Sequence, residues 1–388
     1  MLSCRPGGIM TITSFTTTKS LTVLRGPGAM AGIGKALDRS GTSRAFILTG
    51  QSIATKTPLL AALQDALGPR FAGHYDRIGA HTPMPELIEA VIAARAAGAD
   101  TIVALGGGSV IDAAKIAAAC LALGIDTMDA LREKIVTQTR DPIRGLPVVV
   151  MIPTTASAAE FTTGAGVFDP EKRHKNGLNN PALVPDLVVL DPELIAHTPP
   201  TLWLSSAIRS VDHAVEALGG WRATPYTDAL AEKALELLFD ALPRCHADPS
   251  DLAAVGDVQT ATWLAGTACT GAGTGISHGI GYLFGANFGV PHGFCSCITL
   301  PHVMAWNGAA GAKADRVLRR VTGQPGPEAV DALIRGMNLP RALSEVSDVR
   351  RDQALSLAPK ALTLPHAPRN PRVLDDEGEA RALLERMF

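Results

Sequence analysis

Three histidines and one arginine have the residue types and the spacing for a reactive centre. Arg209 and His213 lie four residues apart in a stretch with helical periodicity, and His278 and His292 follow on later segments. Residues at i and i+4 share one face of a helix, so Arg209 and His213 point the same way. Three imidazoles with one open position make a chemically sound metal site. The set therefore predicts a metal centre or a group of catalytic imidazoles, with three unrelated structural histidines as the alternative.

The positive charge of Arg209 disfavours a metal ion at this position. A guanidinium about 4 Å from a unit positive charge costs about 4 kcal/mol at an effective dielectric of about 20, and roughly twice that against a divalent ion. Asp212 does not offer a substitute ligand, because it points about 100° around the helix from His213. We therefore expect no metal. If one binds, its ligands are His213, His278 and His292.

The second feature that could bind a ligand is a glycine loop between a predicted strand and a predicted helix. Glycine lets the backbone approach a pyrophosphate, and the helix N-terminus offers free N–H groups and a positive dipole end. The loop and the helix supply six candidate residues: Gly106, Gly107, Gly108, Ser109, Asp112 and Lys115. They predict dinucleotide binding, although a tight turn without a ligand has the same residues. The spacing is not the GxGxxG of an ordinary Rossmann dehydrogenase.

These residues need a scaffold, and the first half of the chain alternates strand and helix signals. Short apolar runs predict strands at 44–49, 101–105, 146–152 and 187–190. Helical periodicity lies between them at 58–67, 86–97 and 110–122. Strands separated by helices at this spacing imply βαβ units and a mostly parallel sheet.

The sequence pattern changes after the Pro199-Pro200 pair, where the strand signals end. Periodic segments rich in alanine and leucine predict helices at 203–218, 225–242, 251–272 and 276–283. The prolines of 364–372 predict an extended loop. We therefore expect an α/β nucleotide-binding domain at residues 1–195, with a flexible tail at 1–15, and an all-helical catalytic domain at 196–388.

Composition and charge exclude several classes of function. A net charge of −2 leaves no basic excess for nucleic acid. No apolar run reaches the ~18 residues of a membrane span, and the N-terminal segment lacks the apolar core of a secretory signal. Cys295 and Cys297 are the one close pair among scattered cysteines, and we interpret them as small apolar filler. Free thiols suit a reducing compartment, so we expect a cytoplasmic protein that binds neither nucleic acid nor membranes.

The GGGSxxDxxK loop, followed by Ile152-Pro-Thr-Thr155, resembles the iron-containing alcohol dehydrogenase superfamily, and the resemblance covers nearly the whole chain. It implies the dehydroquinate synthase-like fold, with the active site in the cleft between the two domains. It also implies that NAD or NADP binds, with Thr154 and Thr155 against the cofactor. Members that prefer NAD usually carry an aspartate where this chain has Gly50. Because a carboxylate there would repel a 2′-phosphate, we expect NADPH to be at least tolerated.

The same resemblance matches the three histidines to metal ligands of the superfamily. Metal-dependent members hold Fe²⁺ or Zn²⁺ with an aspartate, a histidine four residues later and two further histidines. His213, His278 and His292 match the histidines, and Arg209 stands in the place of the aspartate. Tyr282 replaces a further family histidine one turn after His278.

Loss of the carboxylate ligand resembles the maleylacetate reductase branch, which works without a metal. Three stretches of this chain are similar to that branch: the short spacing from the threonines to Glu160, Lys175 ahead of the 181–185 segment, and the short tail that follows Asn370-Pro-Arg372. The resemblance places Lys175 with the cofactor-binding residues.

The branch implies a metal-independent NAD(P)H-dependent reductase of an unsaturated oxo-acid of the maleylacetate type, as in aromatic-compound catabolism. It also implies a small-molecule carboxylate as the substrate and a homodimer. The alternatives are a metal-dependent alcohol or aldehyde dehydrogenase of the same superfamily, a dehydroquinate synthase-like cyclase, and a nucleotide-binding protein without catalysis.

Within the first of these functions, Arg209 would hold a substrate carboxylate or the developing enolate through its bidentate N–H groups. Its structural alternative is a salt bridge to Asp212, Glu216 or another helix. His278 and His292 would orient the acyl group of the substrate, and His213 would line the pocket. The proton that completes the reduction would come from His278, His292 or Tyr282.

Overall fold

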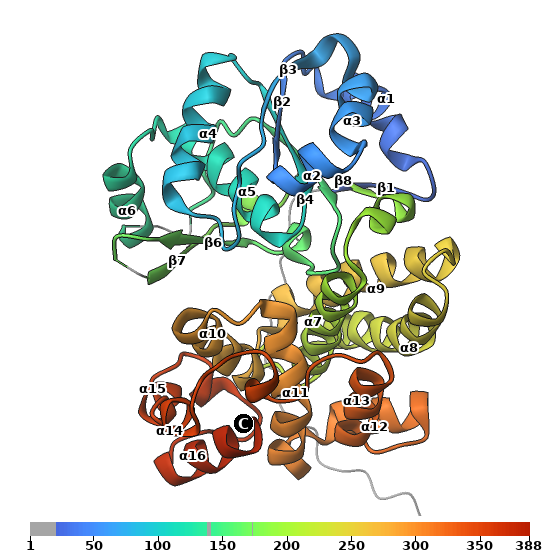
Figure 1. The fold of residues 1–388 in the computed structure, drawn as a ribbon, viewed down its shortest axis with the longest axis vertical. Helices are drawn as coiled ribbons and strands as arrows, with labels where there is room; N and C mark the ends of the chain where they lie inside the picture. Colours follow the sequence, from blue (N-terminus) through green and yellow to red (C-terminus); the bar gives the residue numbers. More distant parts are fainter. Residues whose placement is uncertain (1–20, 138–140, 173) are drawn as a thin grey trace, which may run out of the picture.

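The chain forms an α/β half and a helical half that stack along the longest axis of the molecule (Figure 1). The computed structural model describes residues 21–137, 141–172 and 174–388. The predicted flexible tail at 1–15 therefore lies outside the described residues.

A six-stranded sheet forms the centre of the α/β half. Its order is β1-β8-β5-β4-β2-β3, and every neighbouring pair is parallel. The strands are β1 Thr22–Arg25, β2 Ala45–Thr49, β3 Phe71–Tyr75, β4 Thr101–Gly106, β5 Val148–Pro153 and β8 Leu187–Leu190. Strands β2, β4 and β8 are buried along their whole length, as a parallel sheet covered on both faces requires.

Strand β4 shows how the two faces are filled. Ile102 and Ala104 pack with α4 and α5 on one face, whereas Val103 and Leu105 pack with α1 and α3 on the other. Alternate residues of a strand point to opposite faces, so one apolar run serves both layers. Figure 1 shows the two helix layers on opposite sides of the sheet. The helices of this half are α1 Ile33–Leu37, α2 Gln51–Lys56, α3 Leu59–Leu67, α4 Met84–Ala96, α5 Gly108–Leu123 and α6 Met128–Val136.

An antiparallel hairpin lies outside the sheet, on the side of the α/β half that faces α10 (Figure 1). It consists of β6 Gly164–Asp169 and β7 His174–Asn179. Arg132 of α6 holds it through Asp169, with Nε and Nη2 donating to the two carboxylate oxygens at 2.7 and 3.0 Å. The hairpin is thereby fixed beside the helical half.

Helix α7 is the centre of the helical half. Every residue from Trp203 to Leu218 is buried, so polar side chains on this helix have to find partners inside the protein. Two apolar clusters surround it, one with α8, α9, α12 and α13 and the other with α10, α11 and the C-terminal helices. The helices are α7 Pro200–Leu218, α8 Pro225–Ala247, α9 Leu252–Ala272, α10 Ile276–Phe288, α11 His292–Asn307, α12 Ala312–Thr322, α13 Gly326–Gly336, α14 Arg351–Leu355, α15 Ala358–Leu362 and α16 Glu377–Arg386.

The predicted fold class is confirmed: a parallel sheet with covering helices is followed by an all-helical half. Strands β1 and β3 and the hairpin were not predicted, and a short 3-10 helix at Ala367–Arg369 interrupts the loop predicted at 364–372. The predicted boundary at 195/196 falls inside the 3-10 helix Pro192–His197, ahead of α7.

No single helix in the described ranges is both long and apolar enough to cross a membrane. Helix α5 and most of α6 satisfy that criterion only as a pair bent by 98°, and α5 packs in the core beside the sheet.

Candidate active site

The predicted glycine loop joins β4 to α5 at the carboxyl edge of the sheet. A Cβ on Gly107 would lie 3.1 Å from Thr155, and one on Gly108 would lie 3.1 Å from Ser157 Oγ. The loop backbone therefore packs directly against the segment that follows β5. Thr155 Oγ1 and Ser157 Oγ are buried without a hydrogen-bond partner among the described residues. Unpartnered hydroxyls beside a helix N-terminus fit an anionic cofactor group.

The other predicted cofactor residues divide into two groups. Gly50 and Thr154 directly follow β2 and β5, so they lie at the same sheet edge as the glycine loop. Ser109 and Asp112 bind neighbouring segments instead. Ser109 Oγ accepts the N–H of His81 at 3.0 Å, and the Asp112 carboxylate accepts an N–H from strand β6 at 2.9 Å.

Lys115 binds the backbone of the segment that follows β5. It is fully buried, and its Nζ donates to the carbonyl oxygens of Ala159 and Thr162 at 2.6 Å each and to that of Gly164 at 3.0 Å. Burial lowers the pKa of this ammonium to about 8, although Asp112 and other carboxylates act to raise it. The lysine therefore ties α5 to the segment after β5 rather than facing a nucleotide.

Helix α7 buries four charged or titratable side chains: Arg209, Asp212, His213 and Glu216. Arg209 Nη1 lies 3.9 Å from Asp212 Oδ2 and 3.3 Å from Ser296 Oγ, and its guanidinium carbon lies 5.4 Å from the centre of the Tyr282 ring. The salt bridge to Asp212 that was the structural alternative for Arg209 is thus present. One face of the guanidinium still points toward Tyr282.

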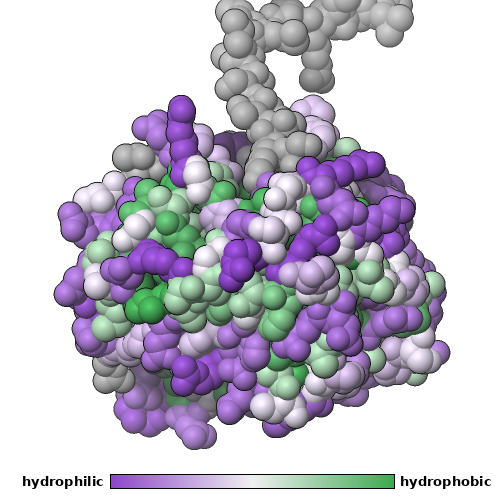
Figure 2. All heavy atoms as spheres, turned by 90° about the horizontal axis from the view of Figure 1, so that it is seen from above, coloured by the Kyte–Doolittle hydropathy of each residue, from purple (hydrophilic) through white to green (hydrophobic). Residues whose placement is uncertain are grey.

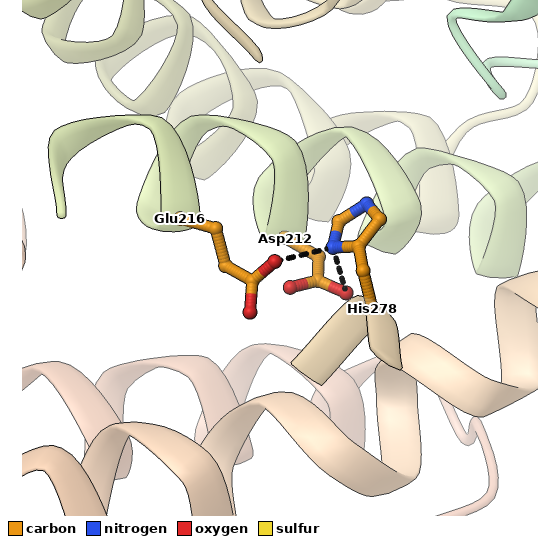
Figure 3. Close-up of side chains that lie close together, drawn as sticks. All are labelled: Asp212, Glu216 and His278. Carbon is orange, nitrogen blue, oxygen red and sulfur yellow. Dashed lines mark hydrogen bonds and ion pairs between the residues drawn. The ribbon is translucent and has the colours of Figure 1, made fainter. Parts of the chain in front are cut away.

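His278 at the start of α10 meets the two carboxylates of α7 (Figure 3). Its Nδ1 lies 2.6 Å from Glu216 Oε2 and 3.4 Å from Asp212 Oδ2. Asp212 Oδ2 also accepts the hydroxyls of Ser296 at 2.7 Å and Ser277 at 3.1 Å. The other ring nitrogen of His278, Nε2, is buried and has no partner among the described residues. One side of the ring is therefore held, and the other is free for a ligand.

The two histidines beside Arg209 differ in charge. Burial and Arg209 act to lower the pKa of His278, but the Asp212 and Glu216 carboxylates outweigh them, so the pKa is raised. The His213 ring centre lies 4.7 Å from that of His278. Burial, followed by the charges of His278 and Arg209, holds the pKa of His213 well below its ordinary value. The site thus pairs one imidazole that favours the protonated form with one that stays neutral.

The predicted cofactor residue Lys175 binds the predicted catalytic residue His292. Lys175 reaches from β7, and its Nζ lies 2.8 Å from Nε2 of His292, the first residue of α11. Gly166 permits this approach, because a Cβ there would lie 2.6 Å from Lys175 Cε. Burial lowers the pKa of His292, and Lys175 and Arg209 lower it further. A neutral His292 accepts a hydrogen bond from the lysine, which joins the two halves of the molecule.

His81 was not predicted from the sequence, yet its ring lies 5.7 Å from that of His292 in an edge-to-face arrangement. His81 and Thr82 both have left-handed backbones, with φ of 63° and 57°. The Thr82 hydroxyl donates to the Ser109 carbonyl at 2.8 Å. The glycine loop therefore holds this strained turn and brings His81 to the site. No local spacing signals such a contact.

Tyr282 lies at the centre of the group. Its ring centre is 6.4 Å from that of His278, 5.9 Å from that of His292 and 5.8 Å from that of His366. The side chain is 43% exposed although these rings surround it, so it borders open space. The structure thus brings together all five predicted catalytic residues and adds His81 and His366, the latter from the loop at 364–372.

A possible set of metal ligands lies beside the site, and it is not the predicted trio of histidines. Among the described residues, only Asp212, Glu216 and His278 place three possible ligand atoms within 4.8 Å of one another, and the trio of His213, His278 and His292 does not. The ligand atoms of this set already share hydrogen bonds with one another or with neighbouring serines and backbone N–H groups. The Arg209 guanidinium also lies 3.9 Å from the Asp212 oxygen, where it would repel a divalent ion.

Both halves of the chain match models of a known protein family. The family model of iron-containing alcohol dehydrogenases matches residues 21–192, and the model of the C-terminal region of the Fe-containing alcohol dehydrogenase family matches residues 204–388. Together they span most of the chain.

Individual relatives differ in what they act on. Maleylacetate reductase 1 of Cupriavidus pinatubonensis is 29% identical over 340 residues, which cover 86% of this chain and 88% of the relative. A 1-propanol dehydrogenase of Citrobacter freundii is 31% identical over 341 residues, which cover 82% and 87%. Among solved structures, the maleylacetate reductase of Agrobacterium tumefaciens superposes with a TM-score of 0.83 at 26% identity, covering 98% of this chain and 99% of that one.

Proposed function

Because this chain belongs to the iron-containing alcohol dehydrogenase family and is an oxidoreductase, we propose that it reduces an unsaturated oxo-acid of the maleylacetate type with NAD(P)H, and without a metal ion. The observation that carries the proposal is the buried guanidinium of Arg209, which lies beside His213, His278 and Tyr282. A fixed cation there can stabilise negative charge on a substrate oxygen, which is the task of a Lewis acid in a metal site. The similarity to maleylacetate reductases over most of the chain supports the same assignment.

The glycine loop and the segment after β5 would hold the cofactor. Gly107 and Gly108 let the loop pack closely against this segment, and Thr155 Oγ1 and Ser157 Oγ are buried hydroxyls without a partner in the described chain. Gly50 follows β2 and has no carboxylate, so a 2′-phosphate would meet no repulsion from this position. Both NADH and NADPH should therefore support reduction.

Arg209 would stabilise the charge that develops during reduction. When bound, NAD(P)H supplies a hydride to the carbon β to the ketone. The double-bond electrons then move toward the ketone oxygen, which becomes an enolate oxygen. The Arg209 guanidinium can donate hydrogen bonds to this oxygen or to a substrate carboxylate.

His278 would supply the proton that completes the reaction. Its pKa is raised, its Nδ1 is held by Glu216, and its Nε2 is free. Transfer of the Nε2 proton to the carbon α to the ketone restores the carbonyl and leaves a neutral imidazole. His292 is less suited to donation, because its pKa is well below the ordinary value. Tyr282 would act as a hydrogen-bonding group at the centre of the site.

The direct test measures NAD(P)H oxidation with maleylacetate, with related unsaturated oxo-acids and with simple aldehydes, in protein purified without chelator. We expect the oxo-acids to be reduced and the rate to survive EDTA. Reduction of aldehydes alone, or loss of all activity with EDTA, would overturn the proposal.

A metal-dependent alcohol or aldehyde dehydrogenase is the second candidate. Two observations favour it: the 31% identity to a 1-propanol dehydrogenase, and the set of Asp212, Glu216 and His278, whose ligand atoms lie close together. Elemental analysis of the purified protein separates the two candidates. Near-stoichiometric iron or zinc that is required for turnover would support the second.

A further inference from the structure

Glu216 is a buried carboxylate next to the site that contacts two backbone N–H groups and one imidazole. Its Oε2 accepts the Gly275 N–H at 2.7 Å, and its Oε1 accepts the Ser277 N–H at 2.7 Å. Its Oε2 also lies 2.6 Å from His278 Nδ1, and this contact is one of the dashed lines in Figure 3. The side chain is only 5% exposed, so these contacts are made out of water.

This arrangement decides which nitrogen of His278 carries the proton. Each Glu216 oxygen accepts a backbone N–H, so both oxygens serve as acceptors at the start of α10. An acceptor next to Nδ1 requires Nδ1 to be the donor. The Asp212 oxygen 3.4 Å away accepts serine hydroxyls and imposes the same requirement. In the neutral ring, Nε2 is thus the free acceptor on the substrate side.

Glu216 also helps to fix the helix that carries His278. The first N–H groups of a helix have no partner within the helix, and a negative charge there opposes the helix dipole. Glu216 binds the N–H groups of Gly275 and Ser277, and Asn370 Oδ1 accepts the intervening N–H of Ile276 at 3.0 Å. Two side chains therefore cap the start of α10, but only Glu216 also contacts the imidazole.

We propose that Glu216 is a positioning residue for the reduction: it holds the His278 ring with Nδ1 protonated and Nε2 directed at the substrate. The proposal rests on the function proposed above in its kinetic part only, because the proton position on His278 exists without substrate.

The surroundings of Glu216 provide a way to test this role. Glu216 and Gly275 line a cavity of about 440 Å³ between α7, α11, α12 and α13, and His278 is not among its lining residues. Truncation of the side chain in Glu216→Ala would leave a space that joins this cavity and retains the two backbone donors. A small carboxylate such as formate has the charge and size to replace the missing group.

The test compares Glu216→Ala with Asn370→Ala, which removes the other cap of α10 without touching His278. We expect Glu216→Ala to lower kcat by about 10- to 100-fold, the range for loss of a group that orients a histidine, with the KM for NAD(P)H unchanged. Sodium formate should restore part of kcat in Glu216→Ala and none in Glu216→Ala/His278→Gln. Asn370→Ala should lower the melting temperature and leave kcat near that of the unchanged protein.

Nitrogen NMR of the unchanged protein provides a measurement that does not depend on turnover. With histidines labelled with ¹⁵N, and His278 assigned by its loss in His278→Gln, Nδ1 should be of the protonated type and Nε2 of the unprotonated type when the ring is neutral. The reverse tautomer would overturn the proposal, and so would an unchanged kcat in folded Glu216→Ala or an equal fall in Asn370→Ala. Failure of the unchanged protein to reduce any oxo-acid would reject the proposed reaction, and the NMR tautomer would then decide the role of Glu216.

Discussion

Replacement of Arg209 by methionine tests the central cation of the site, because it removes the charge and keeps most of the apolar stem. Arg209 Nη1 lies 3.9 Å from Asp212 Oδ2, and the two side chains are 8% and 0% exposed. At an effective dielectric of about 20, this pair attracts with about 4 kcal/mol. Asp212 keeps its serine partners and His278, so part of its stabilisation remains. We expect Arg209→Met to lower the free energy of unfolding by about 3 kcal/mol, which is the lower end for breaking a buried pair.

The catalytic loss has a separate magnitude. A hydrogen bond to a charged group contributes about 1.5–3 kcal/mol, which corresponds to a fall in kcat/KM for the oxo-acid of about 10- to 150-fold. The KM for NAD(P)H should change much less than the KM for the oxo-acid. Steady-state rates of NAD(P)H oxidation, with each substrate varied at saturation of the other, measure both effects, and denaturant unfolding measures the stability.

A double variant separates the structural role of Arg209 from its catalytic role. Arg209→Met/Asp212→Asn removes the unpaired carboxylate while an amide oxygen still accepts from Ser277 and Ser296. We expect it to recover most of the lost stability and none of the lost kcat/KM. Recovery of both would show that Arg209 acts only as a partner for Asp212. Equal rises in the two KM values would also refute a role at the substrate.

Three further predictions follow from the same geometry. Since the Asp212 and Glu216 carboxylates raise the pKa of His278 against the effect of burial, kcat should fall only as pH rises through this raised pKa. The contribution of His278 to stability is complete below its pKa in the unfolded chain and is lost as pH rises through the raised value. Asp212→Asn should move this alkaline limb of the pH–rate profile to lower pH, and an unmoved limb would contradict the assignment. Gly50→Asp should raise the KM for NADPH about tenfold relative to that for NADH, since a new carboxylate faces the 2′-phosphate position, and an unchanged ratio would show that this position does not contact the ribose. Lys175→Met should raise the KM for NAD(P)H if Lys175 binds the cofactor, whereas a rise in the substrate KM alone would place the lysine with the oxo-acid.

Sequence spacing predicted the parts of the site that depend on one element. The glycine loop follows from a strand, a turn and a helix in direct succession, and Arg209 and His213 follow from helical periodicity. These features are local, so neighbours along the chain determine them. The parallel sheet could be predicted for the same reason, because the central strands are short, continuous apolar runs.

The remainder depends on contacts between distant segments. Asp212 is turned away from His213 on an isolated helix, but α10 places His278 on that side, so Asp212 becomes part of the site. Strand β7 was missed because its sequence, HKNGLN, is polar and contains glycine and asparagine, which are depleted in strands. With β7 missing, the contact of Lys175 with His292 could not be expected. His81 depends on a strained turn that no residue pattern signals.

The burial of α7 from Trp203 to Leu218 limits which substitutions the charged residues of the site can accept. Arg209, Asp212 and Glu216 share one enclosed space with His278, so their charges must balance among themselves rather than through water. A carboxylate at position 209 would gather three anions around one imidazole and would require a new cation in the same step. Exchange between an arginine-based and an ion-based form of this pocket therefore requires a replacement cation, and a variant with the added carboxylate but without such a cation should be less stable than the present protein.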